Sequence, residues 1–255
     1  MIVGEIRRLI EAEAVPVWGL SRASKMANEP PGHRPEDLLP GAESLICFGI
    51  PIPQAVYRMP AYGLETIWRS QNTHYRRLDT LSLRIATLLE ESGARAVPTY
   101  GCMPLGVNQK GVIVGYLNQI RMAEVTGIGI IGRNGLLLHS HYGARLMLGG
   151  ILTTVSLPEL HYPELQEPGC PPDCRICADA CPVNAIMADQ KKVKIMRCLS
   201  YTARTPLMSR IKFAVLSAFN PQDAARYMSI TSFDEHTFHI CSQCVALCPY
   251  GNERK

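Results

Sequence analysis

The chain has 255 residues, of which 47% are hydrophobic and 19% are charged, with a mean hydropathy of +0.02 and a formal net charge of +4 at pH 7. No run approaches the roughly 18 consecutive apolar residues that span a bilayer, so we expect no membrane span. The mild positive charge includes no long basic run, and it therefore permits a nucleic-acid partner without indicating one.

The N-terminal residues predict a cytoplasmic protein that begins with a helix. Arg7 and Arg8 are followed by the acidic Glu11 and Glu13, not by the uninterrupted apolar stretch of a twin-arginine export signal. Residues 1–14 place their apolar side chains at helical spacing, which predicts a short amphipathic helix.

Strands and helices then alternate along the chain. Residues 15–20, 44–50 and 94–100 predict strands, because they are short apolar runs bounded by turn residues. Residues 62–92 predict the longest helix, with leucines and an isoleucine on one face and a glycine just after its end. This alternation predicts an α/β or α+β domain over residues 1–160.

Gly127, Gly129 and Gly132 match the dinucleotide-binding pattern G-x-G-x-x-G. That fingerprint follows a strand, opens a helix and has an acidic residue about 20 positions further on. Here residues 122–126 predict the end of a helix, and the region near residue 150 contains no acid. The context therefore argues against a nucleotide site.

Seven of the ten cysteines lie in two short runs, at residues 170–182 and 241–249. Each run contains Cys-x-x-Cys-x-x-x-Cys-Pro, the ligand spacing of ferredoxins that hold two cubane iron–sulfur clusters. Soft thiolates in such short loops converge on neighbouring irons. Clustered cysteines in a chain without an export signal also favour metal binding over disulfides.

The spacing predicts a ligand set for each cluster. In two-cluster proteins of this type, the cysteine before proline binds the other cluster. The second cluster then lacks one ligand, and Cys198 is the candidate for it. The first set is Cys170, Cys174, Cys177 and Cys248, and the second is Cys181, Cys198, Cys241 and Cys244.

Two zinc sites are the alternative use of eight cysteines, but the terminal Cys-Pro of both runs is typical of ferredoxins. Cys47 and Cys102 remain, and we interpret them as small buried apolar residues. Helices are predicted at residues 207–219 and 221–228, between the runs. Basic residues in the same interval either offset the negative charge of clusters or form a solvated face: Lys191, Lys192, Lys194, Arg197, Arg204, Arg210 and Lys212.

Further motifs accompany the cysteines: a glycine-rich stretch at residues 127–138, Leu-Gly-Gly-Ile-Leu-Thr-Thr at 148–154 and Arg-Cys-Leu-Ser-Tyr at 197–201. Their order resembles the epoxyqueuosine reductase family, which is related to the reductive dehalogenases. The resemblance implies a nitroreductase-like domain over residues 1–160 that binds base-off cobalamin. It further implies a ferredoxin-like module over residues 161–255, with two [4Fe–4S] clusters and a helical insertion.

The resemblance also suggests roles for residues outside the cysteine runs. It places corrinoid contacts at Gly127, Gly129, Gly132 and Arg133. It places candidate proton donors in the middle region of the chain, where the family has its cofactor cavity. These candidates are Tyr116, His139, His141, Tyr142 and Lys110.

The chain departs from the family at its catalytic acid. The family has an acidic residue shortly before the glycine-rich stretch, whereas the gap-free equivalent here is Ile113, which cannot donate a proton. The histidine motif that binds cobalt, Asp-x-His-x-x-Gly, is absent, since Asp234-Glu-His236 does not continue to glycine; this absence agrees with base-off binding and equally with no corrinoid, and is not a departure from the family. We therefore expect a shorter paralogue without the catalytic aspartate.

Three functions follow from these observations. The first is a cobalamin-dependent iron–sulfur reductase that receives electrons from a small ferredoxin or flavodoxin. The second is an electron-transfer protein that reduces a partner or its corrinoid, which the missing acid favours. The third is a flavin reductase of the nitroreductase type, for which the sequence contains no flavin signature.

Overall fold

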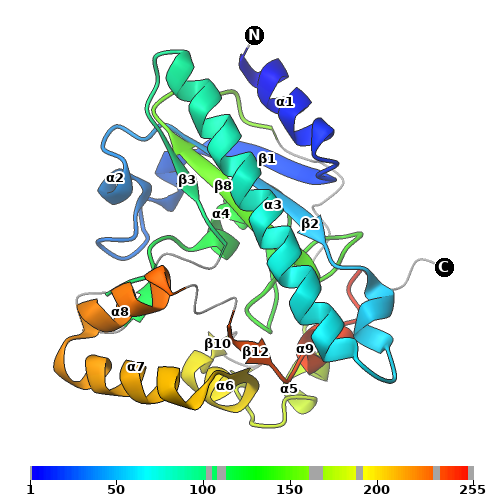
Figure 1. The fold of residues 1–255 in the computed structure, drawn as a ribbon. Helices are drawn as coiled ribbons and strands as arrows, with labels where there is room; N and C mark the ends of the chain where they lie inside the picture. The colour runs from blue at the N-terminus through cyan, green and yellow to red at the C-terminus, as the bar shows by residue number, and fades with distance from the viewer. Residues whose placement is uncertain are drawn as a thin grey trace.

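The computed structural model describes residues 2–101, 105–107, 113–160, 169–187, 192–231 and 236–251 and has a mixed helix-and-strand fold (Figure 1). Cys102 and Lys110 lie outside the described residues. The N-terminal part contains α1 (Ile2–Ala12), β1 (Val17–Arg22), η1 (Ala23–Met26), α2 (Pro35–Leu38), β2 (Ser44–Pro51), η2 (Gln54–Arg58), α3 (Gly63–Glu91), β3 (Ala96–Thr99), β4 (Leu105–Val107), β5 (Ile113–Gly115), α4 (Gln119–Val125), β6 (Ile130–Ile131), β7 (Leu137–Leu138) and β8 (Leu146–Thr153).

The C-terminal part consists of short elements around two longer helices. The helices predicted at residues 62–92, 207–219 and 221–228 are confirmed as α3, α7 and α8. The elements are α5 (Ile176–Asp179), β9 (Ile186–Met187), β10 (Lys192–Val193), α6 (Ile195–Thr202), β11 (Ala203–Arg204), α7 (Leu207–Phe219), α8 (Pro221–Ile230), β12 (Phe238–His239) and α9 (Gln243–Ala246).

A four-stranded sheet in the order β1-β2-β8-β3 forms the centre of the N-terminal part. All of its strand pairs are antiparallel, and β2 pairs with β8 from Ser44 opposite Thr153 to Pro51 opposite Leu146. Of the predicted α/β or α+β alternatives, this pairing matches α+β, because α/β folds are built on parallel strands. Strand β8 was not recognised in the sequence, since its paired glycines interrupt the apolar run.

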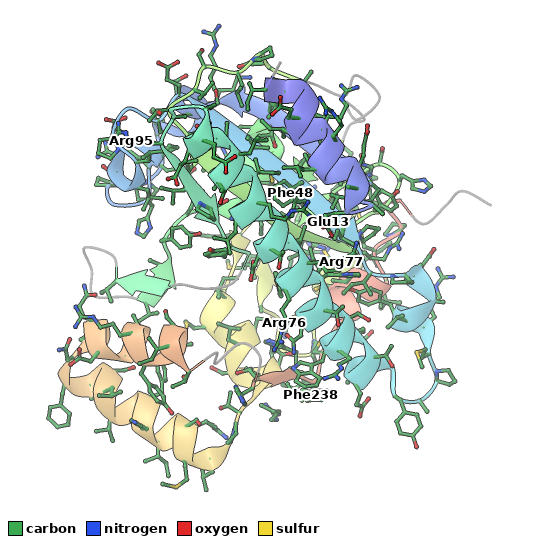
Figure 2. The ribbon with its side chains drawn as sticks, turned by 45° about the horizontal axis from the view of Figure 1, so that its top comes forward. Glu13, Phe48, Arg76, Arg77, Arg95 and Phe238 are labelled. Atoms are coloured by element: carbon green, nitrogen blue, oxygen red, sulfur yellow. The ribbon has the colours of Figure 1, made fainter. Side chains whose placement is uncertain are left out.

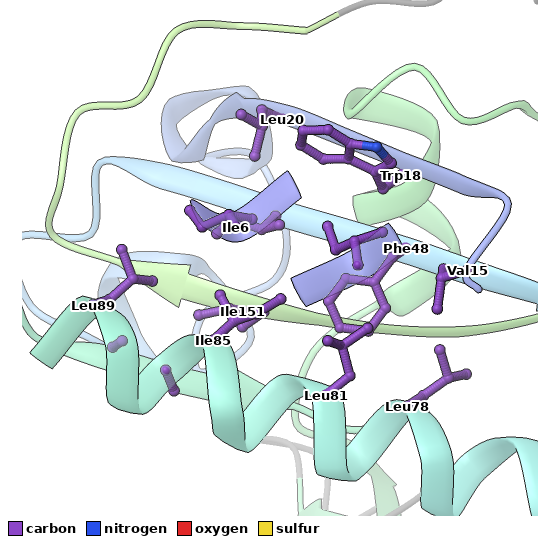
Figure 3. Close-up of a cluster of buried hydrophobic side chains, with 14 of the residues drawn as sticks. Ile6, Val15, Trp18, Leu20, Phe48, Leu78, Leu81, Ile85, Leu89 and Ile151 are labelled. Atoms are coloured by element: carbon purple, nitrogen blue, oxygen red, sulfur yellow. The ribbon is translucent and has the colours of Figure 1, made fainter. Parts of the chain in front are cut away.

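Different helices cover the two faces of the sheet. Along β2, Ile46, Phe48 and Ile50 belong to one core, whereas Leu45 and Cys47 belong to the other, as alternate side chains of a strand must. The first face packs on α1 and α3 (Figure 3). The second packs on α4 and η1. Cys47 is therefore a core residue, as predicted.

Helix α3 joins the sheet to the C-terminal part. Near its start, the ring of Trp68 meets that of Phe238 in β12 edge to face, with 6.4 Å between the ring centroids. Further along, Arg77 and Arg84 donate hydrogen bonds to the backbone carbonyl and carboxylate oxygens of Glu13, just after α1 (Figure 2). The helix is thus held to both parts of the molecule.

The C-terminal part has little core of its own. Among the described residues, its buried cluster comprises Cys177, Ala178 and Ile186, with three partly buried neighbours. Helix α5 contacts α9, and α7 packs on α8, which in turn contacts the β4–β5 hairpin. In the described part of the chain, no helix combines the length and apolar character needed to cross a membrane.

Gly150 provides a test of the sheet packing. A Cβ added to this residue would meet the carbonyl oxygen of Ile46 and the Cε atom of Met122. We expect Gly150→Ala to lower the free energy of unfolding by roughly 1–3 kcal/mol, the usual cost of overpacking, as measured by thermal unfolding followed by circular dichroism. Gly4→Ala is the control, because a Cβ at that helical position meets nothing within 4 Å. Equal melting temperatures for the two variants would contradict the packing described.

Candidate metal centre

Both cysteine runs fold in the same way around a one-turn helix. Helix α5 follows Cys174 and contains Cys177, and α9 follows Cys241 and contains Cys244. A three-residue step around a helical turn puts both sulfurs on the same side of the backbone. Because α5 and α9 contact each other, two runs that are distant in sequence lie side by side.

Four thiols influence one another at the first site. Burial raises the pKa of Cys177, and the charges of Cys170 and Cys174 raise it further. Burial raises the pKa of Cys248 to about 11; a backbone hydrogen bond from Tyr250 opposes this, and the same three thiols add to the rise. Such charge effects act at short range. Cys248 from the last run therefore lies near the first three thiols of the first run.

A second group of thiols adjoins the first. Burial raises the pKa of Cys198, and the charges of Cys181 and Cys241 raise it further. Burial raises the pKa of Cys244 to about 12, with added contributions from these three thiols and from Cys177. These interactions parallel the two ligand sets predicted from the sequence, which stay a prediction, and Cys177 and Cys244 pack in one buried cluster.

The thiols also accept backbone hydrogen bonds. The N–H group of Ala185 donates to Sγ of Cys181 at 3.2 Å, and that of Arg133 donates to Sγ of Cys170 at 3.4 Å. Hydrogen bonds to sulfur are among the features that set the potentials of iron–sulfur clusters. Within the described residues, no three histidine, cysteine, aspartate or glutamate side chains are arranged to hold a single metal ion.

The β6–β7 hairpin reaches from the N-terminal part to both cysteine runs. Arg133 contacts the first run through its backbone N–H, and its guanidinium donates to the carbonyl oxygens of the two prolines after Cys170. Its neighbour Asn134 donates from Nδ2 to the carbonyl oxygen of Cys244 at 3.3 Å. Two adjacent residues of the hairpin loop, Arg133 and Asn134, therefore contact both cysteine runs.

The glycines of the G-x-G-x-x-G stretch have packing roles. Gly127 has a φ of +79° and ends α4, where its N–H group donates to the carbonyl oxygen of Glu124. This arrangement confirms the predicted helix end, and it reverses the strand-then-helix order of a nucleotide fingerprint. Added Cβ atoms at Gly129 and Gly132 would meet Leu138 of the facing strand.

The turn after β7 meets the C-terminus of the described chain. Gly143 has a φ of +56°, and an added Cβ would meet the carbonyl oxygen of Tyr250. Gly251, with a φ of +72°, lies equally close to the backbone of Gly143. Only glycines permit two backbones to approach in this way. This contact anchors the segment that carries Cys248.

A buried cation lies near the second thiol group. Arg145 is 9% exposed and donates from Nη1 to the carbonyl oxygen of Ile52 at 3.1 Å, while its Nε has no partner among the described residues. Burial raises the pKa of Tyr57 to about 12, an effect that Arg145 opposes and the charge of Cys244 reinforces. The charges of Arg145 and Cys244 therefore both act on Tyr57.

Two cavities flank α9. One, of about 530 Å³, is lined by Tyr57, Glu65, Tyr201 and Cys241 together with neighbouring residues of η2 and α3. The other, of about 470 Å³, is lined by Tyr57, Cys248 and further residues of α9. A thiol of each group therefore borders open space.

Comparison with known proteins was made by sequence and by structure. No family model matches the chain. The epoxyqueuosine reductase of Lactococcus garvieae is 34% identical over 140 residues, which are 55% of this chain and 34% of the relative. The epoxyqueuosine reductase of Synechocystis sp. is 30% identical over 178 residues, which are 69% of this chain and 56% of the relative.

The chain is a homologue of the epoxyqueuosine reductases. It spans about half, or less, of the length of these curated relatives. The epoxyqueuosine reductase structure from Streptococcus thermophilus matches all of this chain and 67% of its own, with a TM-score of 0.59 at 20% identity. A catabolic reductive dehalogenase matches 89% of this chain and 35% of its own, with a TM-score of 0.55 at 17% identity. The fold is thus shared with both kinds of protein.

Tyr116, one of the candidate proton donors, uses its hydroxyl to hold the backbone of the N-terminal part together. Its hydroxyl accepts a hydrogen bond from the N–H of Tyr100 at 2.6 Å and donates to the carbonyl oxygen of Pro98 at 3.3 Å. Burial raises its pKa to about 12. The phenol therefore joins β3 to the segment after β5. Ile113, the equivalent of the family's acid, is half-buried in β5 and pairs with Val107.

His139, His141 and Tyr142 form one turn. Nδ1 of His139 accepts hydrogen bonds from the N–H groups of His141 and Tyr142, at 3.0 and 3.3 Å. Burial and the nearby His141 lower the pKa of His139 to about 4, so its imidazole is neutral near pH 7. The ring of Tyr142 packs against both imidazoles. The three candidates come together, and among the residues that line the two cavities none of them occurs.

Sequence reasoning missed Tyr57, Asn134 and Arg145. Asn134 and Arg145 lie close to the motifs of the sequence analysis. The sequence pattern, however, does not distinguish a residue that contacts a distant part of the chain from an ordinary surface residue. Tyr57 lies in a loop with no motif at all. These residues gain their role from contacts that exist only after the two parts of the chain have packed together.

Replacing Gly143 with alanine tests the anchor of the last cysteine run. We expect Gly143→Ala to speed amide hydrogen exchange across residues 241–251, because the added Cβ displaces the Tyr250 carbonyl. The control is Gly93→Ala, since Gly93 also has a positive φ, +88°, but an added Cβ meets nothing within 4 Å. Exchange that is unchanged in residues 241–251 of Gly143→Ala would show that this contact does not hold the run.

Proposed function

We propose that the chain is an iron–sulfur oxidoreductase that carries electrons through two [4Fe–4S] clusters. The observation that supports this most directly is that Cys177, Cys181 and Cys244, which come from two distant runs, pack in one cluster beside the contact between α5 and α9. One cluster is held by Cys170, Cys174, Cys177 and Cys248, and the other by Cys181, Cys198, Cys241 and Cys244. When bound, such clusters supply one-electron transfer.

The rest of the chain contributes the setting for these clusters. In the proposal, residues 161–255 form the ferredoxin-like module, and residues 1–160 form a nitroreductase-like domain in the cytoplasm that positions it. Asn134 holds the second run through the carbonyl of Cys244, and the N–H groups of Arg133 and Ala185 point their dipoles at sulfur. Such N–H dipoles favour the more negative, reduced state of a cluster.

A base-off cobalamin is the proposed electron acceptor, for reduction of a substrate that is not identified. Only similarity supports a cobalamin here: the structure of one neighbour, a reductive dehalogenase, is described as suggesting a mechanism for B12-dependent dehalogenation. Among the residues that the resemblance suggests as corrinoid contacts, Gly127 ends α4, Gly129 and Gly132 pack on Leu138, and Arg133 contacts the first run. No step of the proposal is therefore assigned to a corrinoid-binding residue.

An electron-transfer protein without its own substrate site is the second candidate. One structural neighbour, the epoxyqueuosine reductase of Bacillus subtilis, is described with an aspartate catalytic loop, and the gap-free equivalent predicted from this sequence is Ile113. An alkyl side chain in β5 cannot donate a proton to a substrate. A further solved homologue was captured with a tRNA stem loop, so tRNA belongs among the substrates to be tested.

Metal and cofactor analysis separates these candidates. We expect protein purified without oxygen to contain about eight irons per chain, the number in two cubane clusters, and to show their visible absorbance. One cobalt per chain supports the reductase, and iron without cobalt supports the electron-transfer protein. A chain that binds zinc and no iron would falsify the central claim, and bound flavin would favour a flavin reductase.

The role of Cys198 can be tested by substitution. We expect Cys198→Ala to lose the electron paramagnetic resonance signal of one reduced cluster, because that cluster keeps only three thiolates, and to retain the other. Cys47→Ala is the matched control, since Cys47 is fully buried in the core behind β2 and lies in neither thiol group. If both signals persist in Cys198→Ala, then this thiol is not a ligand.

A further inference from the structure

Helix α7 has an unusually apolar surface. It contains no buried residue, yet Leu207, Met208, Ile211, Val215 and Phe219 are all exposed, with Met208 at 74% and Phe219 at 86%. Exposed apolar side chains that gather on one surface mark interaction sites more often than single ones do. The apolar surface of this helix therefore requires an explanation.

The position of α7 leaves this surface uncovered. The half-buried side chains of Ser209, Phe213 and Leu216 recur at helical spacing, as expected for the side that packs on α8. Helix α8 in turn contacts the β4–β5 hairpin, so α7 is an outer layer at the edge of the molecule (Figure 1). The five apolar residues lie off the packed side.

Helix α6, which precedes α7 in the chain, also has exposed apolar side chains. Ile195, Met196 and Leu199 of that helix are exposed, at 56%, 68% and 40%. We call these three residues, together with the five exposed apolar residues of α7, the α6–α7 face. Helix α6 also carries Cys198, which is half-buried among the second group of thiols. One helix therefore separates the face from the proposed second cluster.

The residues around the face are strongly basic. Residues 192–231 contain seven lysines and arginines and one acid, Asp223, which gives a net charge of +6 (7 − 1). Asp223 is paired with Arg226 at 3.4 Å. The other basic residues, including Arg210 and Lys212 on α7, have no carboxylate within residues 192–231 to neutralise them. The surroundings of the face therefore attract an acidic partner.

We propose that the α6–α7 face docks an acidic one-electron donor protein of the ferredoxin or flavodoxin class, an inference that rests on the proposed function. The donor loses one electron for each electron that this chain accepts, and no proton or further reactant takes part. Apolar residues at the centre with charges around them are the usual composition of a protein interface. Docking here brings the donor to the helix that carries Cys198.

Other occupants fit the face less well. A second copy of the chain would set two surfaces of like charge against each other. Nucleic acid would use the basic residues but leave the leucine, isoleucine and valine side chains without partners. A lipid surface could contact both the basic and the apolar side chains, as it does with interfacial helices. It would make no use of the position of Cys198. These occupants become outcomes of the test.

The test measures how fast a reduced donor transfers electrons to the iron-loaded protein. An acidic bacterial ferredoxin and a flavodoxin, each reduced beforehand, are mixed with the protein in an anaerobic stopped-flow instrument while cluster absorbance is recorded. We expect Arg210→Glu to lower the second-order rate constant at low salt about tenfold and to flatten its salt dependence. We expect Met208→Gln to weaken binding of the same donors, because a desolvated apolar contact is lost.

Matched controls carry the same substitutions elsewhere. Arg8→Glu changes an exposed arginine of α1, and Leu83→Gln changes an exposed apolar residue of α3. Both are expected to react with the donors like the wild-type protein. Dithionite, which needs no docking surface, is expected to reduce the clusters of all variants equally, which shows that they remain intact.

Several results would overturn the proposal. Donor rates that are unchanged in Arg210→Glu and Met208→Gln, with dithionite reduction intact, place donor docking elsewhere while leaving the proposed function standing. Docking is likewise placed elsewhere if Met208→Gln instead abolishes a dimer or binding to phosphatidylglycerol vesicles, or if Arg210→Glu impairs only the binding of a tRNA stem loop. If dithionite fails to reduce the wild-type protein, the proposed function fails and the docking proposal fails with it.

Discussion

The arrangement of the C-terminal part depends on holding two groups of thiols close together, although each thiol opposes the ionisation of its neighbours. Burial and neighbouring thiols both raise the pKa of Cys177 and Cys244. A segment whose buried apolar side chains are mostly alanines and cysteines has too small a hydrophobic core to hold such groups by packing alone. The N-terminal part supplies what is missing, through hydrogen bonds from Arg133 and Asn134 and the close backbone contact at Gly143.

Electrostatics around the thiols follow from the same constraint. Arg145 is buried and, in the described part of the chain, has no carboxylate partner, a state that ordinarily carries a large desolvation cost. The cost is smaller if anionic clusters lie nearby, and the charges of Arg145 and Cys244 both act on the pKa of Tyr57. The net positive charge of residues 192–231 would offset the negative charge of clusters in the same way.

Local patterns in the sequence were sufficient for the long helices and several strands, whereas the assignment of the cysteines to two clusters stays a prediction. Helix α7 was predicted with its observed bounds because its residues favour helix and prolines flank it, and Cys47 was placed in a core because its run is uniformly apolar. Strand β8 was missed, since Gly149 and Gly150 weaken a strand pattern and are required only because β2 and the helices press against them. Tyr57 and Arg145 were missed because their neighbours come from other parts of the chain.

The C-terminal part has two kinds of accessible region, the cavities beside α9 and the exposed α6–α7 face. The two cavities beside Cys241 and Cys248 are bordered by η2 and α9, and Tyr201 of α6 also lines the first of them. The α6–α7 face consists of other residues of α6 and α7, none of which lines either cavity. A protein that only stored electrons would need one point of access. Separate access at the α6–α7 face and at the cavities suits a path that electrons enter through the face and leave through a cavity. On the proposed function, the identity of the electron acceptor is therefore decided at the cavities, and the donor is selected at α7.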